Sequence, residues 1–340
     1  MDMQSAIRRV TERQDLSSAE MTEVMGTIMS GGATPAQIGG FLIGLRMKGE
    51  TVAEIAAAAA VMRELAERVE VGLEGVLDTC GTGGDASGTL NVSTAAAFVA
   101  AAAGVPVAKH GNRSVSGRSG SADVLEAAGA SLDLDCTALS RCIEQVGVAF
   151  MFAPLHHGAM KHAVGPRREM GVRTLFNVLG PLTNPAGARR QLLGVYAPQW
   201  VRPIAEVLRE LGSERVLVVH AEDGLDELSI ASPSLVAELV DGDIREYKIT
   251  PQDLGIREAP LSEVQVAGAE DSLRLITSAF SGESSAAAEL IALNSGAAIY
   301  AAGGVDSLQA GVDHAKDLMG SGAAAAKLHS FVEKTRELAG

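Results

Sequence analysis

The sequence has few aromatic residues and few cysteines. Only 3% of its 340 residues are Phe, Trp or Tyr although 47% are hydrophobic, so helices must pack closely through alanine, glycine and leucine. The three cysteines, Cys80, Cys136 and Cys142, are odd in number and form no CxxC pair. This pattern favours neither a disulfide framework nor a zinc site, and we expect a reduced, cytoplasmic protein.

Long hydrophobic runs are also absent. The longest, from Ala95 to Ala108, is broken by Gly104 and Pro106 and is too short to cross a bilayer. Residues 1–15 lack an apolar core and are typical of an amphipathic helix rather than a signal peptide. We therefore expect no membrane partner.

The sequence also has fewer basic than acidic residues. The chain has 28 Lys and Arg against 42 Asp and Glu, a formal net charge of -14. This balance argues against a broad polyanion-binding surface, so we expect no nucleic-acid partner. Any anionic ligand must be bound by a local site that departs from the average charge.

Residues 1–70 show helical patterns, whereas strands and helices alternate from residue 75. Capping boxes begin at Ser17, Thr34 and Thr51, each with Glu or Gln three residues later. The later alternation is typical of a parallel sheet with crossover helices, and an antiparallel strand pair is expected around residues 241–243. The expected strands are 75–78, 105–109, 148–153, 191–197 and 215–220.

These patterns predict an α/β protein in two parts. We expect a small all-helical N-terminal domain at residues 1–72, completed by helices near 166–190. The large domain, residues 73–340, should hold a mostly parallel central sheet flanked by helices.

The stretch Asp78–Asp85, DTCGTGGD, follows the first expected strand and holds three glycines. Together with Ala86 it formally fits the G-x-G-x-x-G/A pattern of dinucleotide-binding folds. Two features count against that interpretation. The next helix begins only near Asn91, and no Asp or Glu occurs from Ala86 to Ala122, where a ribose-binding acid should lie. A P-loop is excluded because no G-K-[ST] follows.

Two neighbouring segments favour a phosphate-rich ligand over a purely structural turn. Asn91–Thr94, NVST, lies at a helix N-terminus, where free backbone N–H groups attract anions; helix capping alone is the alternative. The loop from Lys109 to Ser121 carries three cations and no acid. The glycine loop Asp78–Asp85 and the loop that begins at Lys109 should leave the carboxyl ends of neighbouring strands, where ligands bind in open α/β sheets.

Read together, DTCGTGGD, NVST and KHGNRSVSGRSGSADVLEAAG resemble the anthranilate phosphoribosyltransferases. The resemblance continues through HHGAMKHAVGPRREMGVRTLFNVLGPLTNP and AEDGLDELS, and it covers most of the chain. It implies transfer of a phosphoribosyl group from phosphoribosyl pyrophosphate (PRPP) to the amine of anthranilate, with Mg²⁺, in tryptophan biosynthesis. It also implies a fold shared with pyrimidine nucleoside phosphorylases and a homodimer formed through the helical domains.

The resemblance further implies site residues. Anthranilate would contact Gly81, His110, Asn112 and Arg167. The PRPP site would comprise Gly81, Gly84, Asp85, Thr89, Asn91, Val92, Ser93, Thr94, Lys109, His110, Gly111, Asn112, Arg113, Ser114, Val115, Ser116, Gly117 and Ser121.

Two Mg²⁺ ions per subunit are implied, one held by Ser93 and Glu227 and one by Asp226 and Glu227. As an isolated dipeptide, Asp226-Glu227 would be read as a solvated acid pair. No residue is implied as an obligatory acid or base. Three residues, Lys109, Asp85 and Asn112, would act by electrostatics and positioning.

The residues alone leave some roles open. Arg167 could pair the planar carboxylate of anthranilate bidentately, but on spacing alone Arg168 is an equal candidate. His156, His157 and His162 fit a polar lining for the aromatic acceptor better than a metal site. We expect Asp85 to face Mg²⁺ and its waters, or to accept a hydrogen bond, rather than to meet bare phosphate.

Two other functions remain as alternatives. A pyrimidine nucleoside phosphorylase of the same fold would use phosphate and a nucleoside. A non-catalytic relative would bind nucleic acid through the same site, and should carry a broad basic face that this acidic chain lacks.

Overall fold

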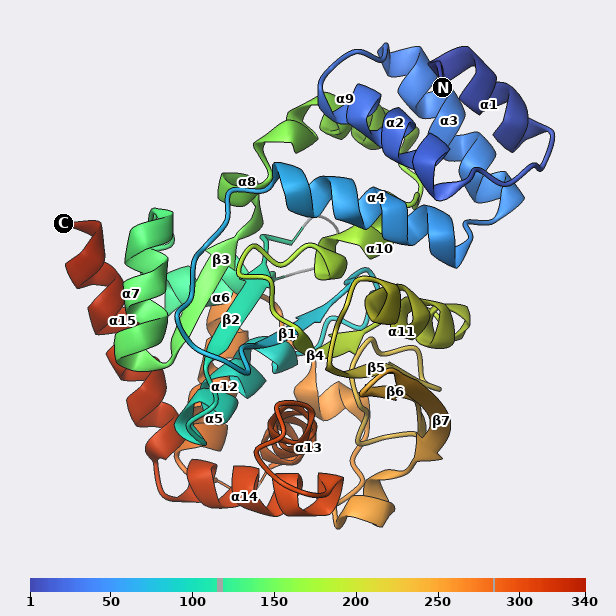
Figure 1. Ribbon diagram of the computed structural model, residues 1–340. Coiled ribbons are helices and arrows are strands. Elements are labelled where there is room, and N and C mark those ends of the chain that lie inside the picture. Colours follow the sequence, from blue (N-terminus) through green and yellow to red (C-terminus); the bar gives the residue numbers. More distant parts are fainter. Residues whose placement is uncertain (115–118, 284) are drawn as a thin grey trace.

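The computed structural model describes residues 1–114, 119–283 and 285–340 (Figure 1). Val115, Ser116 and Gly117, expected at the PRPP site, lie outside these ranges. A small helical part precedes a larger part built on a mostly parallel sheet, so the predicted fold class is confirmed. Within the described ranges, no helix has the length and apolar character needed to cross a membrane.

The N-terminal part consists of short helices with well-defined starts. The capping boxes at Ser17, Thr34 and Thr51 are confirmed: each hydroxyl accepts a hydrogen bond from the backbone N–H three residues later. The four helices are α1 (Met3–Thr11), α2 (Ser18–Met29), α3 (Pro35–Lys48) and α4 (Val52–Leu65). Of the later helices, α9 (Lys161–Met170) packs on α2 and α3, and α10 (Phe176–Leu179) contacts α4.

The sheet has seven strands in the order β3-β2-β1-β4-β5-β6-β7. The first five in chain order are parallel, and β6 and β7 form the antiparallel pair expected around residues 241–243. The strands are β1 (Leu77–Gly81), β2 (Val107–Gly111), β3 (Val148–Phe152), β4 (Arg190–Gly194), β5 (Arg215–Ala221), β6 (Ser234–Val240) and β7 (Asp243–Ile249).

Three strands have boundaries that lie two or more residues from those predicted. The strands β1 and β2 begin two residues later than expected and extend to Gly81 and Gly111. The strand β4 ends at Gly194, three residues early. Pairing explains why β1 and β2 extend: Gly81 lies opposite Gly194 and Gly111 opposite Phe152, so the parallel ladder continues through glycines that the sequence assigned to loops.

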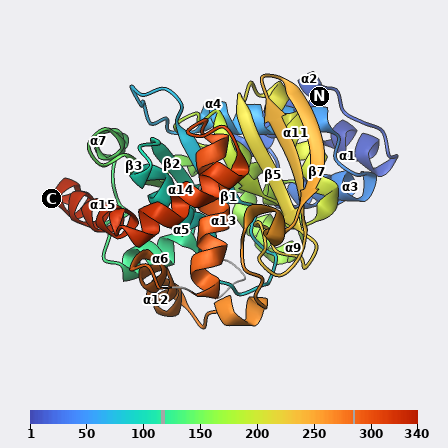
Figure 2. The ribbon, with the colours of Figure 1, turned by 90° about the horizontal axis from the view of Figure 1, so that it is seen from below.

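The sheet separates two hydrophobic cores. Leu192 of β4 lies in the core formed with α5 and α13, whereas Leu193 points to the opposite face, toward α11. Figure 2 shows α5, α13, α14 and α15 gathered on the first side of the sheet. The second core is continuous with that of the N-terminal helices, so the two parts of the chain share buried apolar contacts.

Small residues permit the close helix packing that the scarcity of aromatics requires. A Cβ atom on Gly311 would lie 2.3 Å from the Gly296 carbonyl oxygen, so α13 and α14 meet backbone to backbone. The helices of this part are α5 (Val92–Ala102), α6 (Ser121–Ala127), α7 (Cys136–Val146), α8 (Ala153–His156), α11 (Val201–Glu210), α12 (Ala269–Phe280), α13 (Ala286–Ala301), α14 (Leu308–Gly320) and α15 (Ala323–Ala339).

The topology fixes where a ligand would bind. The strand β1 pairs with β2 on one side and with β4 on the other, so the strand order reverses at β1. In open α/β sheets, ligands bind beyond the carboxyl ends of the strands at such a reversal. The loops after β1, β2 and β5 all begin at this edge.

Candidate active site

The glycine loop after β1 meets the acidic loop after β5. The Gly83 N–H donates to the Asp226 carboxylate, with 2.8 Å between nitrogen and oxygen. A Cβ atom on Gly81 would lie 2.7 Å from Asp226 Oδ2, and one on Gly194 would lie 1.5 Å from the Asp226 carbonyl oxygen. Glycine is therefore required at Gly194, where the obstructing atom belongs to the backbone, whereas a side chain at Gly81 would displace the Asp226 carboxylate.

Two acidic residues at this junction, Asp226 and Glu227, have raised pKa values. Burial, followed by the nearby Asp85 carboxylate, raises the pKa of Asp226 from its ordinary 3.8 to about 7. Burial, followed by the Asp226 carboxylate, raises the pKa of Glu227 to about 8. Asp85 is thus the charged neighbour that raises the pKa of Asp226 most, after burial. A divalent cation placed beside Asp226 and Glu227 would offset their negative charges and lower both pKa values.

Lys109 is the buried cation of the site, with 3% of its surface exposed. Its ammonium group donates to the Thr79 carbonyl oxygen and to the Ser93 hydroxyl, the latter at 3.2 Å. Burial lowers the pKa of Lys109, and the Asp78 carboxylate opposes that shift most strongly. Lys109 thus lies between the strand end of β1 and the first turn of α5.

The N-terminus of α5 holds an acid and a polar network. The Ser93 backbone lowers the pKa of Glu227 and so favours its charged form, which indicates that Glu227 lies near the anion-binding end of this helix. Asn91 precedes the helix, but its side chain caps nothing, contrary to the simple capping alternative. Its Oδ1 instead accepts hydrogen bonds from Ser119 and Ser272, because the incoming backbone of α12 presents Ser272 there.

The loop after β2 is organised by close approaches. A Cβ atom on Gly111 would lie 2.3 Å from the Ser121 hydroxyl, and Ser121 donates to the Asn112 carbonyl oxygen at 3.2 Å. The Ser114 N–H donates to Asp123 at 3.2 Å. Arg113 is exposed and paired with Glu126 of α6.

Two histidines form a neutral, buried pair. The ring centroids of His110 and His157 lie 5.1 Å apart. Burial, followed by the neighbouring histidine rings, lowers the pKa of His110 to about 3 and that of His157 to about 4. His156 hydrogen-bonds the Glu67 carbonyl oxygen, whereas His162 lies against Gly31 in the helical part. The three histidines from 156 to 162 therefore do not form one cluster.

Arg167 lies on α9, apart from the carboxylate network. Its guanidinium carbon is 5.2 Å from the Phe176 ring centroid, and burial lowers its pKa. Arg168, its rival on spacing, is exposed. Thr89 contacts the Ser87 hydroxyl at 3.1 Å, while Val92 and Thr94 are buried in the first turn of α5.

The donor set fits magnesium better than a transition metal. Among residues 1–114, 119–283 and 285–340, no three His, Cys, Asp or Glu side chains converge as a complete metal cage. Mg²⁺ prefers one or two carboxylates, supplemented by phosphate oxygens and water. Asp226, Glu227 and the Ser93 hydroxyl supply such an incomplete set beside a helix N-terminus.

Comparisons with known proteins agree with this geometry. Residues 4–66 match the helical bundle domain of a glycosyl transferase family, and residues 73–325 match its a/b domain. An anthranilate phosphoribosyltransferase from Halorhodospira halophila is 68% identical over 341 residues, covering 100% of both chains. The chain belongs to the anthranilate phosphoribosyltransferase family.

Solved structures extend the comparison. The anthranilate phosphoribosyltransferase of Thermus thermophilus is 44% identical, with a TM-score of 0.92 over 97% of this chain and 99% of its own. The enzyme from Saccharomyces cerevisiae in complex with PRPP and Mg is 25% identical, with a TM-score of 0.91 over 99% of this chain and 98% of its own.

Two positions at the site were missed from the sequence. Gly194 ends a strand. A glycine in a strand pattern can indicate a close approach of another backbone, and this was the only signal that the sequence offered for Gly194. Ser272 carries no local signal, since its hydroxyl becomes relevant only when α12 brings it to Asn91 at 2.8 Å. Both residues act by shaping the loops that the motifs identify.

The carboxylate cluster predicts a pH-dependent stability in metal-free buffer. Because folding raises the pKa of Asp226 to about 7, the native protein keeps a proton between pH 4 and 7 that the unfolded chain has released. This contribution to stability is present below pH 4 and lost as the pH rises through about 7. In EDTA, Asp226→Asn should raise the free energy of unfolding by roughly 1–3 kcal/mol at pH 8.5 and by less than half of that at pH 5, because the stability is lost gradually between the two pKa values.

Denaturant melts at both pH values measure this difference. Asp243→Asn removes an exposed carboxylate at the start of β7 and serves as the matched control. An equal effect of Asp226→Asn at both pH values would contradict the shifted pKa.

Proposed function

We propose that the chain transfers the phosphoribosyl group of PRPP to the amine of anthranilate, giving N-(5-phosphoribosyl)anthranilate and pyrophosphate. The observation that carries this proposal is the meeting of the glycine loop, Lys109, the α5 N-terminus and the Asp226-Glu227 pair at the strand-order reversal. Backbone N–H groups and one buried cation suit a pyrophosphate there.

The reaction forms one bond and breaks another. The anthranilate nitrogen lone pair attacks C1′ of the ribose, and the C1′–oxygen bond breaks with its electron pair leaving on pyrophosphate. The amine then loses its proton to water. Charge builds up on the departing oxygen, where Lys109 and the backbone amides stabilise it, and cation-like character builds up at C1′.

Magnesium would be held by the acidic loop. We assign one ion to Ser93 and Glu227 and a second to Asp226 and Glu227. When bound, the metal supplies positive charge to offset the phosphate oxygens of PRPP. Asp85 would face these ions across the pyrophosphate, which accounts for a carboxylate inside a phosphate-binding loop.

The remaining expected contacts of PRPP follow the glycine-rich loops. Gly81, Gly84 and Gly111 would present backbone amides to the ligand, with Thr89 and Ser121 as flanking hydroxyls. The helix-start residues Asn91 to Thr94 and residues 110–117, which begin at the end of β2, would complete the site.

Anthranilate would bind on the side of α9. Arg167 carries a planar guanidinium that can pair a carboxylate bidentately, and its partial burial strengthens that pairing. Asn112, His110 and Gly81 would contact the same substrate. The neutral His110–His157 pair offers an apolar-compatible surface for an aromatic ring.

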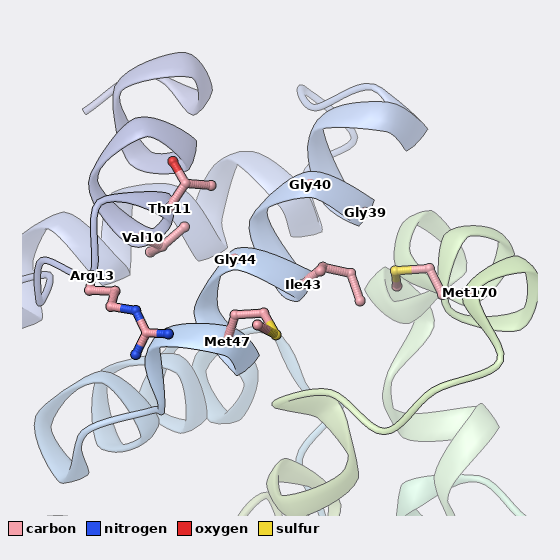
Figure 3. A pocket seen from close by; sticks show the side chains of 9 residues that line it. All are labelled: Val10, Thr11, Arg13, Gly39, Gly40, Ile43, Gly44, Met47 and Met170. Atoms are coloured by element: carbon pink, nitrogen blue, oxygen red, sulfur yellow. The ribbon is translucent and has the colours of Figure 1, made fainter.

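The helical part carries the surface that we assign to a homodimer. A groove of about 580 Å³ is lined largely by apolar residues of α1, α3 and α9 (Figure 3). Met47 and Ile43 are 65% and 38% exposed, although side chains of this size are normally buried. A second copy of the chain would cover the groove with the same surface, as two-fold symmetry requires. The lining residues are Val10, Thr11, Arg13, Gly39, Gly40, Ile43, Gly44, Met47 and Met170.

The domain boundary and compartment belong to the same proposal. We assign residues 1–72 to the helical domain, completed by the segment 166–190, because α9 packs on α2 and α3 and α10 contacts α4. The large domain would span residues 73–340. We place the enzyme in the cytoplasm, as its free cysteines and its biosynthetic substrates suggest.

The proposed activity can be followed by the fluorescence of anthranilate. Purified protein should consume anthranilate only when both PRPP and Mg²⁺ are present, and should not cleave thymidine with phosphate. The Asp226→Ala/Glu227→Ala double variant should lose most Mg²⁺-dependent turnover, roughly 100-fold or more, because it lacks both metal-binding carboxylates. Thymidine phosphorolysis without anthranilate turnover would instead establish a nucleoside phosphorylase.

Arg167 and Arg168 provide a matched pair for the acceptor site. Arg167→Ala should raise the KM for anthranilate by about 10- to 100-fold, because a charge-assisted pair to its carboxylate is lost, and should leave the KM for PRPP nearly unchanged. Arg168→Ala should change neither constant. Steady-state kinetics with each substrate varied in turn distinguishes the two; a higher KM for PRPP alone would remove Arg167 from the anthranilate site.

The dimer surface predicts a change in molecular mass. Wild-type protein should have twice the chain mass of 35.0 kDa by light scattering, whereas Met47→Asp should be monomeric because it places a charge in the apolar groove. Leu73→Asp changes a similarly exposed apolar residue outside the groove and should remain dimeric. A dimeric Met47→Asp would place the interface elsewhere.

A further inference from the structure

Arg173 joins three segments around the glycine loop and has no role in the activity described so far. It lies between α9 and α10, and its guanidinium donates to the Gly84 carbonyl oxygen. The guanidinium carbon lies 4.1 Å from the centroid of the Tyr196 ring, a stacked cation–π contact. Its own carbonyl oxygen accepts a hydrogen bond from Arg46 of α3 at 2.7 Å.

Tyr196 is itself fixed to the same loop. Its backbone N–H donates to the Thr82 hydroxyl at 3.0 Å, and its hydroxyl accepts from Trp200 at 2.9 Å. Thr82 and Gly84 are therefore held from the same side, one by the backbone of Tyr196 and one by the guanidinium stacked on its ring. These contacts together fix the backbone of the loop at Thr82 and Gly84.

The loop contains one costly backbone conformation. Gly83 and Gly84 have φ values of 63° and 78°, which glycine adopts readily, whereas Ala86, at 61°, is a non-glycine residue in the left-handed region. Such a conformation persists when surrounding contacts over-determine it. The same segment presents the Gly83 N–H and the Asp85 carboxylate to the acidic loop, so its shape sets the geometry of the pyrophosphate side.

We propose that Arg173 is a positioning residue that holds the glycine loop in its PRPP-binding shape and ties that shape to α3 of the helical part. It acts through Gly84 and Tyr196 and touches no reacting atom. The inference rests on the proposed function, since PRPP is the ligand assigned to this loop. It links the acceptor side of the site, on α9, to the loop on the pyrophosphate side.

The test separates PRPP binding from catalysis. Arg173→Ala should raise the KM for PRPP by about 10- to 100-fold, with less than about threefold change in kcat and in the KM for anthranilate. Arg173→Lys keeps the charge but loses the planar stack, so an intermediate KM is expected. Arg46→Ala should raise the KM for PRPP in the same direction and by less. Arg202→Ala, an exposed arginine of α11, is the control and should match wild type.

Trp200 provides a readout independent of turnover. It is the only tryptophan of the chain and donates to the Tyr196 hydroxyl, on the ring that the Arg173 guanidinium contacts. Titration with PRPP and Mg²⁺ should change its fluorescence in wild type, and Arg173→Ala should need a correspondingly higher PRPP concentration. Unchanged PRPP affinity in Arg173→Ala, or equal losses for both substrates with a lowered Tm, would overturn the positioning role.

The two proposals can fail separately. If PRPP binding depends on Arg173 but the protein does not consume anthranilate, the transferase proposal is refuted and the positioning role of Arg173 is supported. If the protein consumes anthranilate and every Arg173 variant has normal PRPP affinity, the transferase proposal is supported and the positioning role is refuted.

Discussion

The close approach of the acidic loop to two strand-end glycines is the constraint on which the site depends. Gly81 and Gly194 lie side by side at the carboxyl edge of the sheet, and neither has room for a Cβ atom beside Asp226. This absence of side chains lets the loop after β5 cross the ends of β1 and β4. Glu227 then reaches the α5 N-terminus, and Asp226 reaches the Gly83 amide.

The site also shows how an acidic protein can bind a highly anionic substrate. The net charge of -14 is distributed over the chain, whereas the loops after β1 and β2 carry no acid between residues 86 and 122. Buried Lys109 supplies local positive potential, and the carboxylates opposite are suited to magnesium. Local placement outweighs net charge here because interactions between buried groups are screened little by solvent.

Much of the fold could be predicted from local patterns. The capping boxes at Ser17, Thr34 and Thr51 mark helix starts correctly, because a cap involves residues only three apart. The alternation of apolar strands and helices predicted the parallel sheet. Strand ends were less accurate, since Gly81 and Gly111 continue strands through pairing with neighbours distant in the chain. Ladder register is a property of the assembled sheet.

The sequence by itself determined the elements, the glycines, the acid-free window and, through its long motifs, the family. Only the tertiary structure decided which groups meet: Asn91 with Ser272, Asp226 with Gly83, and Arg173 with Gly84 and Tyr196. The reason is that helix caps and strand patterns depend on neighbours within a few residues. Close packing, burial and the pKa values that follow depend on groups far apart in the sequence, which only the folded chain brings together.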